Sequence, residues 1–182
     1  PDEMALAKVI TEMDRNTDLI LAVGSGSLND LCKFISYKMK LDYMIIATAP
    51  SMDGYASNVA PLITNHAKVT YEAAMPKAIV GDLFVLKEAP MNMIAAGVGD
   101  VLGKYVCLMD WKLSNLITEE YICHDVMELV DTAIEKVMQG TGKLLSRDPD
   151  AIASIMEGLI LSGIGMSYIG NSRPASGSEH HL

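Results

Sequence analysis

The chain has 182 residues, half of them hydrophobic, which suffices for one medium domain or parts of two with a sizeable core. Its net charge of −9 argues against a general nucleic-acid binder, because such proteins normally present a basic face. Three cysteines without paired spacing and no visible signal peptide predict reduced thiols in a cytoplasmic protein. The chain starts at Pro1 without a methionine and stops at Leu182 without a polar tail, so we expect a fragment of a longer chain.

The first half of the sequence, residues 1–89, alternates between helical and strand patterns. Two apolar runs separated by an amphipathic stretch form a βαβ unit, which predicts a parallel sheet with a right-handed crossover. The expected elements are a helix (4–13), a buried strand (19–23), a helix capped by Ser27 (to about residue 40), a second strand (43–47), a hairpin (62–71) and a short strand (78–80).

After Pro90 the pattern becomes entirely helical. Periodicity predicts helices over about 91–115, 124–146 and 149–168, the last capped by Asp148. We therefore place a boundary near Pro90 between an α/β half and an all-α half, residues 90–182. The stretch 151–170 is apolar enough to raise the question of a membrane span, but it contains Glu157 and four glycines, so we expect a buried helix and no membrane insertion.

A glycine-rich turn follows the first strand. Gly24 and Gly26 flank a serine just before a helix begins, so bare backbone N–H groups and the helix dipole could bind a phosphate there. The alternative is a tight turn that needs glycine only for its dihedral angles. Residues 48–58 follow the adjacent strand and therefore lie where open α/β sheets bind their ligands.

Asp100 stands one helical turn before Lys104 and directly after two glycines, Gly97 and Gly99, in a helix interior. The glycines indicate that a backbone or a ligand comes close, and Asp100 is either a functional carboxylate or half of an exposed ion pair. His180 is either a surface histidine or a metal ligand. Asp100 and His180 together could supply oxygen and nitrogen to a divalent metal, but two ligands are too few for a site.

Four segments together resemble the sn-glycerol-1-phosphate dehydrogenases, including their bacterial branch, in the superfamily of iron-containing alcohol dehydrogenases, glycerol dehydrogenases and 3-dehydroquinate synthases. They occur in family order and are 24–30 (GSGSLND), 48–57 (TAPSMDGYAS), 97–104 (GVGDVLGK) and 173–180 (RPASGSEH). The resemblance implies a dehydroquinate synthase-like fold with a Rossmann-like first half, and a homodimer. Ser25 departs from the family, whose members often have glycine at that position.

The resemblance also implies a role for each matching residue. Asp53 would contact the substrate, and Asp100 and His180 would bind a divalent metal, zinc or nickel, and face the substrate. The residues that would bind NAD or NADP are Gly24, Gly26, Ser27, Leu28, Asn29 and Asp30 at the pyrophosphate, and Thr48, Ala49, Pro50, Ser51 and Ser57 at the nicotinamide. A third metal ligand would lie beyond Leu182, and the unit that contacts adenosine before Pro1.

The implied reaction is hydride transfer between NAD(P)H and dihydroxyacetone phosphate, giving sn-glycerol 1-phosphate. The metal would stabilise the developing alkoxide, and Arg173 or Lys104 could bind the substrate phosphate. Two alternatives stay open. One is a glycerol dehydrogenase that acts on an unphosphorylated polyol, and the other is a non-catalytic nucleotide-binding module of the same fold.

Overall fold

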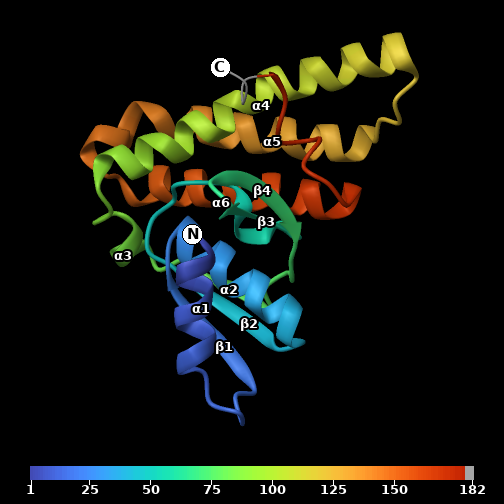
Figure 1. The fold of residues 1–182 in the computed structure, drawn as a ribbon. Helices are drawn as coiled ribbons and strands as arrows, with labels where there is room; N and C mark the ends of the chain where they lie inside the picture. The colour runs from blue at the N-terminus through green and yellow to red at the C-terminus, as the bar shows by residue number, and fades with distance from the viewer. Residues whose placement is uncertain (179–182) are drawn as a thin grey trace.

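The computed structural model describes residues 1–178 and places a small parallel sheet below three long helices (Figure 1). In chain order the elements are α1 (Glu3–Glu12), β1 (Leu19–Gly24), α2 (Gly26–Met39), β2 (Asp42–Ala47), η1 (Gly54–Ala56), β3 (Val59–Thr64), β4 (Ala67–Glu72), β5 (Ala78–Val80), α3 (Leu83–Leu86), α4 (Met91–Thr118), α5 (His124–Gly140), η2 (Thr141–Ser146) and α6 (Pro149–Ile169). The α/β half followed by an all-α half is the fold class that the sequence predicts.

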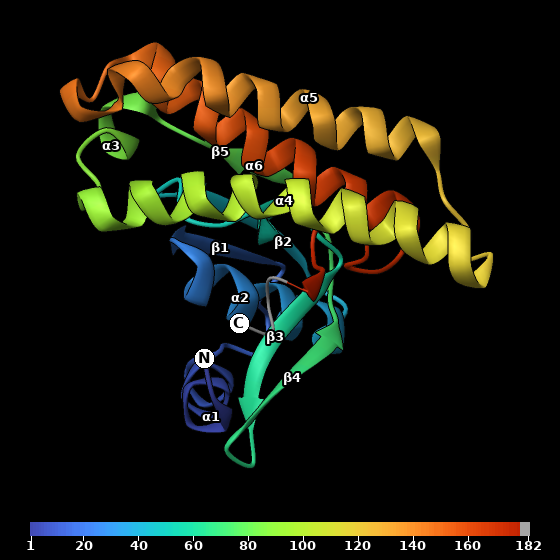
Figure 2. The ribbon, with the colours of Figure 1, turned by 90° about the horizontal axis from the view of Figure 1, so that it is seen from above.

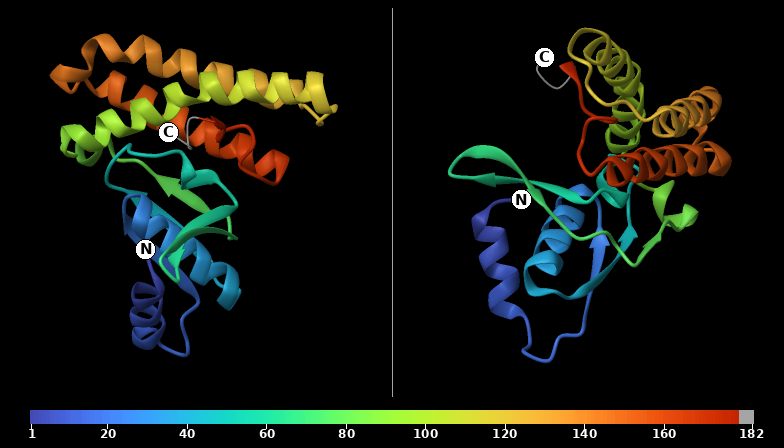
Figure 3. Two further views of the ribbon diagram at one scale, coloured as in Figure 1. Left: turned by 45° about the horizontal axis from the view of Figure 1, so that its top comes forward. Right: turned by 90° about the vertical axis from the view of Figure 1, so that its right-hand side faces the viewer.

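The parallel sheet has the strand order β1-β2-β5, and α2 connects its first two strands. The register runs from Leu19 opposite Asp42 to Gly24 opposite Ala47, so β1 and β2 end level with each other. Both strands point toward the three long helices (Figure 3). The predicted βαβ unit is confirmed, and the edge at which its strands end faces the helical half.

The strand β1 is less buried than the sequence predicts. Ala22 is buried, but the alternate side chains of Leu19, Leu21 and Val23 are 47%, 55% and 53% exposed. The reason is its place at the edge of the sheet, where α2 packs on one face and the other described elements leave the opposite face open. An apolar run alone does not distinguish a strand covered on both faces from one covered on a single face.

The antiparallel hairpin β3–β4 stands apart from the sheet and projects to one side (Figure 3). Its inner face packs on α2, where the rings of Phe34 and Tyr71 meet edge to face at 5.3 Å. Ala60 and Leu62 are buried on that same face. Since side chains alternate along a strand, the neighbouring residues of the hairpin point the other way, toward the helical half.

The helical half consists of α4, α5 and α6, which run back and forth over the sheet (Figure 2). The boundary expected at Pro90 coincides with the N-cap of α4. As predicted, Asp148 caps α6 and accepts hydrogen bonds from the N–H groups of Asp150 and Ala151. The helix α5 stops at Gly140 and continues as the 3₁₀ turn η2, so the helix predicted over 124–146 is one α-helix and one tighter turn.

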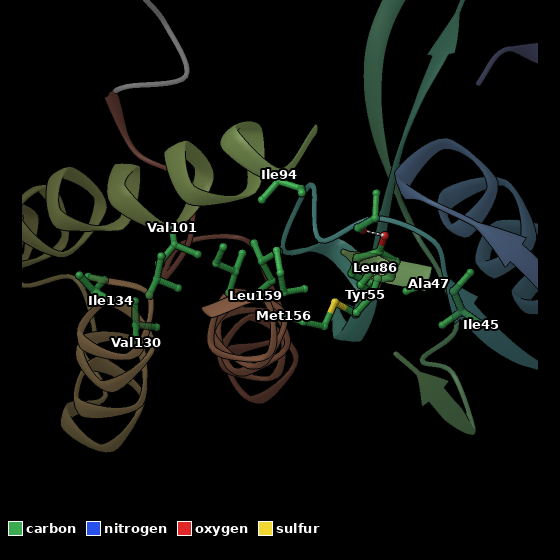
Figure 4. Close-up of a cluster of buried hydrophobic side chains, with 14 of the residues drawn as sticks. Ile45, Ala47, Tyr55, Leu86, Ile94, Val101, Val130, Ile134, Met156 and Leu159 are labelled. Atoms are coloured by element: carbon green, nitrogen blue, oxygen red, sulfur yellow. Dashed lines mark hydrogen bonds between the residues drawn. The ribbon is translucent and has the colours of Figure 1, made fainter. Parts of the chain in front are cut away.

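One apolar core joins the two halves. Ile45 and Ala47 of β2 and Tyr55 of η1 are buried with Leu86 of α3 and Ile94 of α4. Figure 4 shows this cluster continuing into the helices. The helix α6 is long and apolar enough to cross a membrane, but half of its most apolar window is buried within the protein, mainly against α5.

Candidate functional site

The loop that follows β2, residues 48–58, is held between the sheet and the helices by close backbone contacts. A Cβ atom on Gly97 of α4 would lie 1.9 Å from the carbonyl oxygen of Pro50, and one on Gly163 of α6 would lie 2.5 Å from that of Asp53. Both glycines therefore permit a contact that any side chain would block. The expectation that a backbone comes close to the glycines of α4 is confirmed for Gly97, whereas Gly99 faces open space.

The beginning of the same loop is fixed to the end of β1. The N–H of Thr48 donates to the carbonyl oxygen of Gly24 at 3.0 Å, and the hydroxyl of Tyr55 donates to that of Ala49 at 2.7 Å. Ala49 and Pro50 are buried as a result. The glycine turn and the loop thus form one continuous edge at the carboxyl ends of the two strands.

A fully buried lysine on α2 fixes the end of the loop. The ammonium of Lys33 donates to the carbonyl oxygens of Gly54 and Val59 at 2.6 and 2.9 Å and to the hydroxyl of Ser57 at 2.8 Å. Burial lowers the pKa of Lys33 to about 8, and the nearby Asp30 opposes this shift. Hydrogen bonding to three oxygens lets a charged group occupy this interior position.

Two carboxylates and a second buried lysine form the polar centre of the site. The Lys104 ammonium lies 2.8 Å from Asp100 Oδ1 and 2.9 Å from Asp53 Oδ2, and it also donates to the carbonyl oxygen of Ala175 at 2.8 Å. The backbone N–H of Asp53 donates to Asp100 Oδ2 at 2.8 Å, and the Ser162 hydroxyl donates to Asp53 Oδ2 at 2.9 Å. The sequence alternative of an exposed Asp100–Lys104 pair is therefore wrong, because Lys104 is 1% exposed.

The acidity of this centre follows from its burial and its charges. Burial raises the pKa of Asp100, and the Asp53 carboxylate raises it further, while Lys104 opposes both effects. Burial alone would lower the pKa of Lys104, but the two carboxylates outweigh that effect and raise it. Lys104 therefore stays protonated and keeps the paired carboxylates together.

A cavity of about 340 Å³ opens beside this centre, between the α/β half and the helical half. Five residues that the resemblance assigns to cofactor, substrate or metal line it: Asp30, Ser51, Asp53, Ser57 and Asp100. They come from α2, from the loop 48–58 and from α4. The structure thus brings together residues from three separate segments of the sequence.

Four of the other cofactor-assigned residues lie where β1 passes into α2. Gly24 ends β1, and Gly26, Ser27 and Leu28 form the first turn of the helix. The N-cap is Ser25 and not the predicted Ser27, because a single residue separates strand from helix. With φ at −112°, Ser25 needs no glycine, and its hydroxyl forms no capping hydrogen bond that would cover the N–H groups of the first turn.

Asn29 is buried, and its amide nitrogen donates to the carbonyl oxygen of Gly54 at 3.2 Å. It therefore anchors the loop from α2, as Lys33 does.

His180 lies outside the described residues, so the predicted approach of Asp100 and His180 stays a prediction. Within residues 1–178 no group of three metal-ligating side chains occurs, and Asp100 is a carboxylate that lines the cavity.

Sequence reasoning did not single out four residues that shape this site: Lys33, Ser162, Lys68 and Thr70. One signal for Lys33 was available, since it stands three residues after Asp30 on a helix. Ser162 lies in an apolar helix and offered no signal. Lys68 and Thr70 alternate along β4, which predicts a shared face but not what that face lines.

A larger cavity of about 720 Å³ lies elsewhere, beside Trp111 and Tyr121 near the end of α4. It contains one residue from the matching segments, Arg173, whose guanidinium pairs with Glu120 at 3.0 Å. It contains none of the paired carboxylates. The smaller cavity is therefore the candidate active site.

Comparison with known proteins shows which proteins the chain resembles. Residues 2–90 match the family described as iron-containing alcohol dehydrogenase. The solved structures with the same fold include a probable glycerol dehydrogenase from Sinorhizobium meliloti 1021 (TM-score 0.78, 20% identity, 91% of this chain and 50% of that one) and an iron-containing alcohol dehydrogenase from Corynebacterium glutamicum (TM-score 0.78, 21% identity, 98% and 47%). The first half of the chain is thus similar in sequence to the iron-containing alcohol dehydrogenases, and the fold extends this similarity to most of the chain.

The chain is also similar over its whole length to glycerol-1-phosphate dehydrogenases (NAD(P)+). It is 39% identical over 181 residues to the one from Halalkalibacterium halodurans and 37% identical over 181 residues to the one from Bacillus subtilis, in each case over 100% of this chain. These alignments cover 45% and 46% of the relatives. The chain thus spans about half the length of the curated relatives it matches, which agrees with the expectation of a fragment.

Proposed function

We propose that the protein containing this chain is a metal-dependent, NAD(P)-linked dehydrogenase that interconverts dihydroxyacetone phosphate and sn-glycerol 1-phosphate. The observation that supports this most directly is the Asp53–Asp100 pair, which lines a cavity at the carboxyl ends of β1 and β2 beside a glycine turn. A nucleotide on the turn would meet a polyol on the carboxylates at this edge of the sheet. The family and the named relatives favour the same reaction.

Each part of the site has a proposed task. The free N–H groups at the start of α2 bind the cofactor pyrophosphate, and the loop 48–51 with Ser57 orients the nicotinamide. Asp53 accepts a hydrogen bond from a substrate hydroxyl, while Lys104 and Ser162 hold its carboxylate in place. Reduction adds a hydride from NAD(P)H to the carbonyl carbon and a proton to the carbonyl oxygen, and oxidation reverses both transfers.

Asp100 suits a divalent metal, because it offers carboxylate oxygen at the cavity, and His180 is the proposed partner ligand. A bound metal would act as a Lewis acid on the substrate oxygen. The name of the family points to iron, and the resemblance to zinc or nickel. We also propose that the protein is cytoplasmic and that it forms a homodimer. Sedimentation of the complete protein tests the dimer.

The experiment is to assay the complete protein with NAD(P)H and dihydroxyacetone phosphate, and to determine its bound metal by elemental analysis. We expect Asp100→Asn to lower kcat/KM by at least about 100-fold, together with its metal content, because a ligand in direct contact with the metal is lost. The matched control is Asp131→Asn, which changes an exposed carboxylate of α5 that does not line the cavity. Near-normal turnover and metal content in Asp100→Asn would reject the metal role.

The same assay separates the proposed reaction from its alternatives. A glycerol dehydrogenase would turn over glycerol and dihydroxyacetone better than their phosphates. A non-catalytic module would bind NAD(P) without metal-dependent turnover of any of them. Faster turnover of the phosphorylated substrates is the outcome that we expect.

A further inference from the structure

A phosphorylated substrate requires a cation in a cavity that is otherwise rich in carboxylates. Sequence analysis suggested Arg173 and Lys104 for this role, but both side chains bind other groups of the protein. Arg173 pairs with Glu120 and donates to the carbonyl oxygen of Asp110 at 3.1 Å, and it does not line the cavity. Lys104 is buried, and its ammonium contacts three oxygens.

The hairpin supplies a different cation. The cavity is lined by Val59 and Pro61 of β3 and by Lys68 and Thr70 of β4. Pro61 stands directly opposite Thr70, and each strand contributes every second residue, so one face of the hairpin forms this wall. Among the described residues that line the cavity, Lys68 is the one cation.

Lys68 is also available to a ligand. Its side chain is exposed, and it takes part in none of the ion pairs formed within residues 1–178. Lys33, which is buried near the cavity as Lys104 is, donates its hydrogen bonds to the loop. The ammonium of Lys68 is therefore free to neutralise an anion at the hairpin wall.

The charges of the cavity are divided between its walls. Asp30, Asp53 and Asp100 come from α2, the loop and α4, whereas Lys68 comes from the hairpin. Three carboxylates repel a phosphate dianion but accept hydrogen bonds from hydroxyl groups. Lysine is a compact point charge that binds phosphate well, and a threonine hydroxyl can donate beside it.

We propose that Lys68, assisted by the Thr70 hydroxyl, binds the phosphate group of the substrate and selects phosphorylated over unphosphorylated trioses and polyols. This inference rests on the proposed function and deepens it. It orients the substrate with its phosphate on the hairpin and its hydroxyl groups on the carboxylates. The hairpin then determines specificity, while the residues packed around the loop provide the reactive end of the site.

The test uses Lys68→Met in the complete protein. We expect KM for sn-glycerol 1-phosphate to rise by about 10-fold or more, as the loss of one charge-assisted contact predicts, while kcat changes by less than about 3-fold. KM for NAD(P)+ and turnover of glycerol should stay as in the wild type. Lys68→Arg should restore most of the affinity, and Thr70→Val should cause a smaller rise in KM.

The control is Lys112→Met, which removes an exposed lysine of α4 that does not line the cavity. An unchanged KM for sn-glycerol 1-phosphate in Lys68→Met overturns the proposal. A rise in KM for NAD(P)+ instead would assign Lys68 to a cofactor phosphate and overturn it as well.

A binding measurement separates this proposal from the proposed function. Calorimetry with inorganic phosphate should show weaker binding to Lys68→Met than to the wild type, whichever substrate the enzyme turns over. Equal binding to both proteins contradicts the role of Lys68. Absence of sn-glycerol 1-phosphate oxidation by the wild type, with phosphate binding that depends on Lys68, contradicts the proposed function alone.

Discussion

Asp30 is buried in surroundings that disfavour its ionised form. Asp30 is 8% exposed, and its Oδ1 atom has no hydrogen-bond partner within the described chain. The Lys33 ammonium lies 3.9 Å from this atom. Burial raises the pKa of Asp30 to about 6, although Lys33 opposes the shift. An ionised Asp30 therefore lowers the stability of the folded protein at neutral pH and leaves an acceptor free for a ligand hydroxyl.

The raised pKa of Asp30 predicts how the free energy of unfolding depends on pH. Between the unfolded pKa of 3.8 and the folded pKa of about 6, the folded protein binds more protons at Asp30 than the unfolded chain does. The contribution of Asp30 to stability is thus fully present below this window, falls as the pH rises through it, and costs about 3 kcal/mol at most at neutral pH. Asp30→Asn should shrink the difference in unfolding free energy between about pH 4 and about pH 7 by about 1–3 kcal/mol.

Urea unfolding at several pH values measures this difference, with Asp131→Asn on the exposed face of α5 as the control. An identical pH dependence in wild type and Asp30→Asn would show that Asp30 titrates normally in the fold.

At the scale of elements, the site depends on how closely α4 approaches the loop 48–58. Gly97 and Gly99 stand two positions apart on one helix, yet only Gly97 meets another backbone. A helix favours alanine over glycine by about 1 kcal/mol wherever space allows. The two glycines therefore respond to the same substitution in opposite ways.

We expect Gly97→Ala to lower the unfolding free energy by about 1–3 kcal/mol, because its Cβ atom would overlap the Pro50 carbonyl. Gly99→Ala should raise it by about 1 kcal/mol, because nothing lies within 4 Å of its Cβ position. Thermal or urea unfolding of both variants checks the pair. Equal effects of the two substitutions would refute the close contact between α4 and the loop.

Most of the elements could be predicted from the sequence, because apolar periodicity and caps are local signals. The βαβ unit, the hairpin and the capping of α6 by Asp148 depend on such signals. The exposure of β1 and the burial of Lys33 could not be predicted, since each depends on elements that are distant in sequence. The rule that ligands bind after parallel strands predicted the position of the loop 48–58 but not that the hairpin forms the opposite wall.

At the scale of the whole molecule, α4 presents an apolar stripe to solvent. Met109 and Ile117 are 64% and 70% exposed, and further apolar residues recur at helical spacing along the same helix. The members of the stripe are Leu102, Tyr105, Val106, Met109, Leu113, Leu116 and Ile117. A contiguous apolar surface of this kind favours association.

We therefore expect chain 1–182, produced alone, to self-associate and to bind a hydrophobic dye. Met109→Lys combined with Ile117→Lys should roughly halve the dye fluorescence and shift the sedimentation profile toward the monomer. Leu145→Lys on η2 is the control, since Leu145 is 88% exposed but lies outside the stripe. A monomeric wild-type chain without dye binding would contradict the expectation.

The two-stranded hairpin makes the protein suitable for engineering. Its strands are held together by main-chain hydrogen bonds, and the side chains that it presents to the cavity carry none of the packing of the core. A directed-evolution library restricted to residues 68 and 70 would thus explore new ligands of the cavity while the carboxylates and the loop 48–58 keep their geometry.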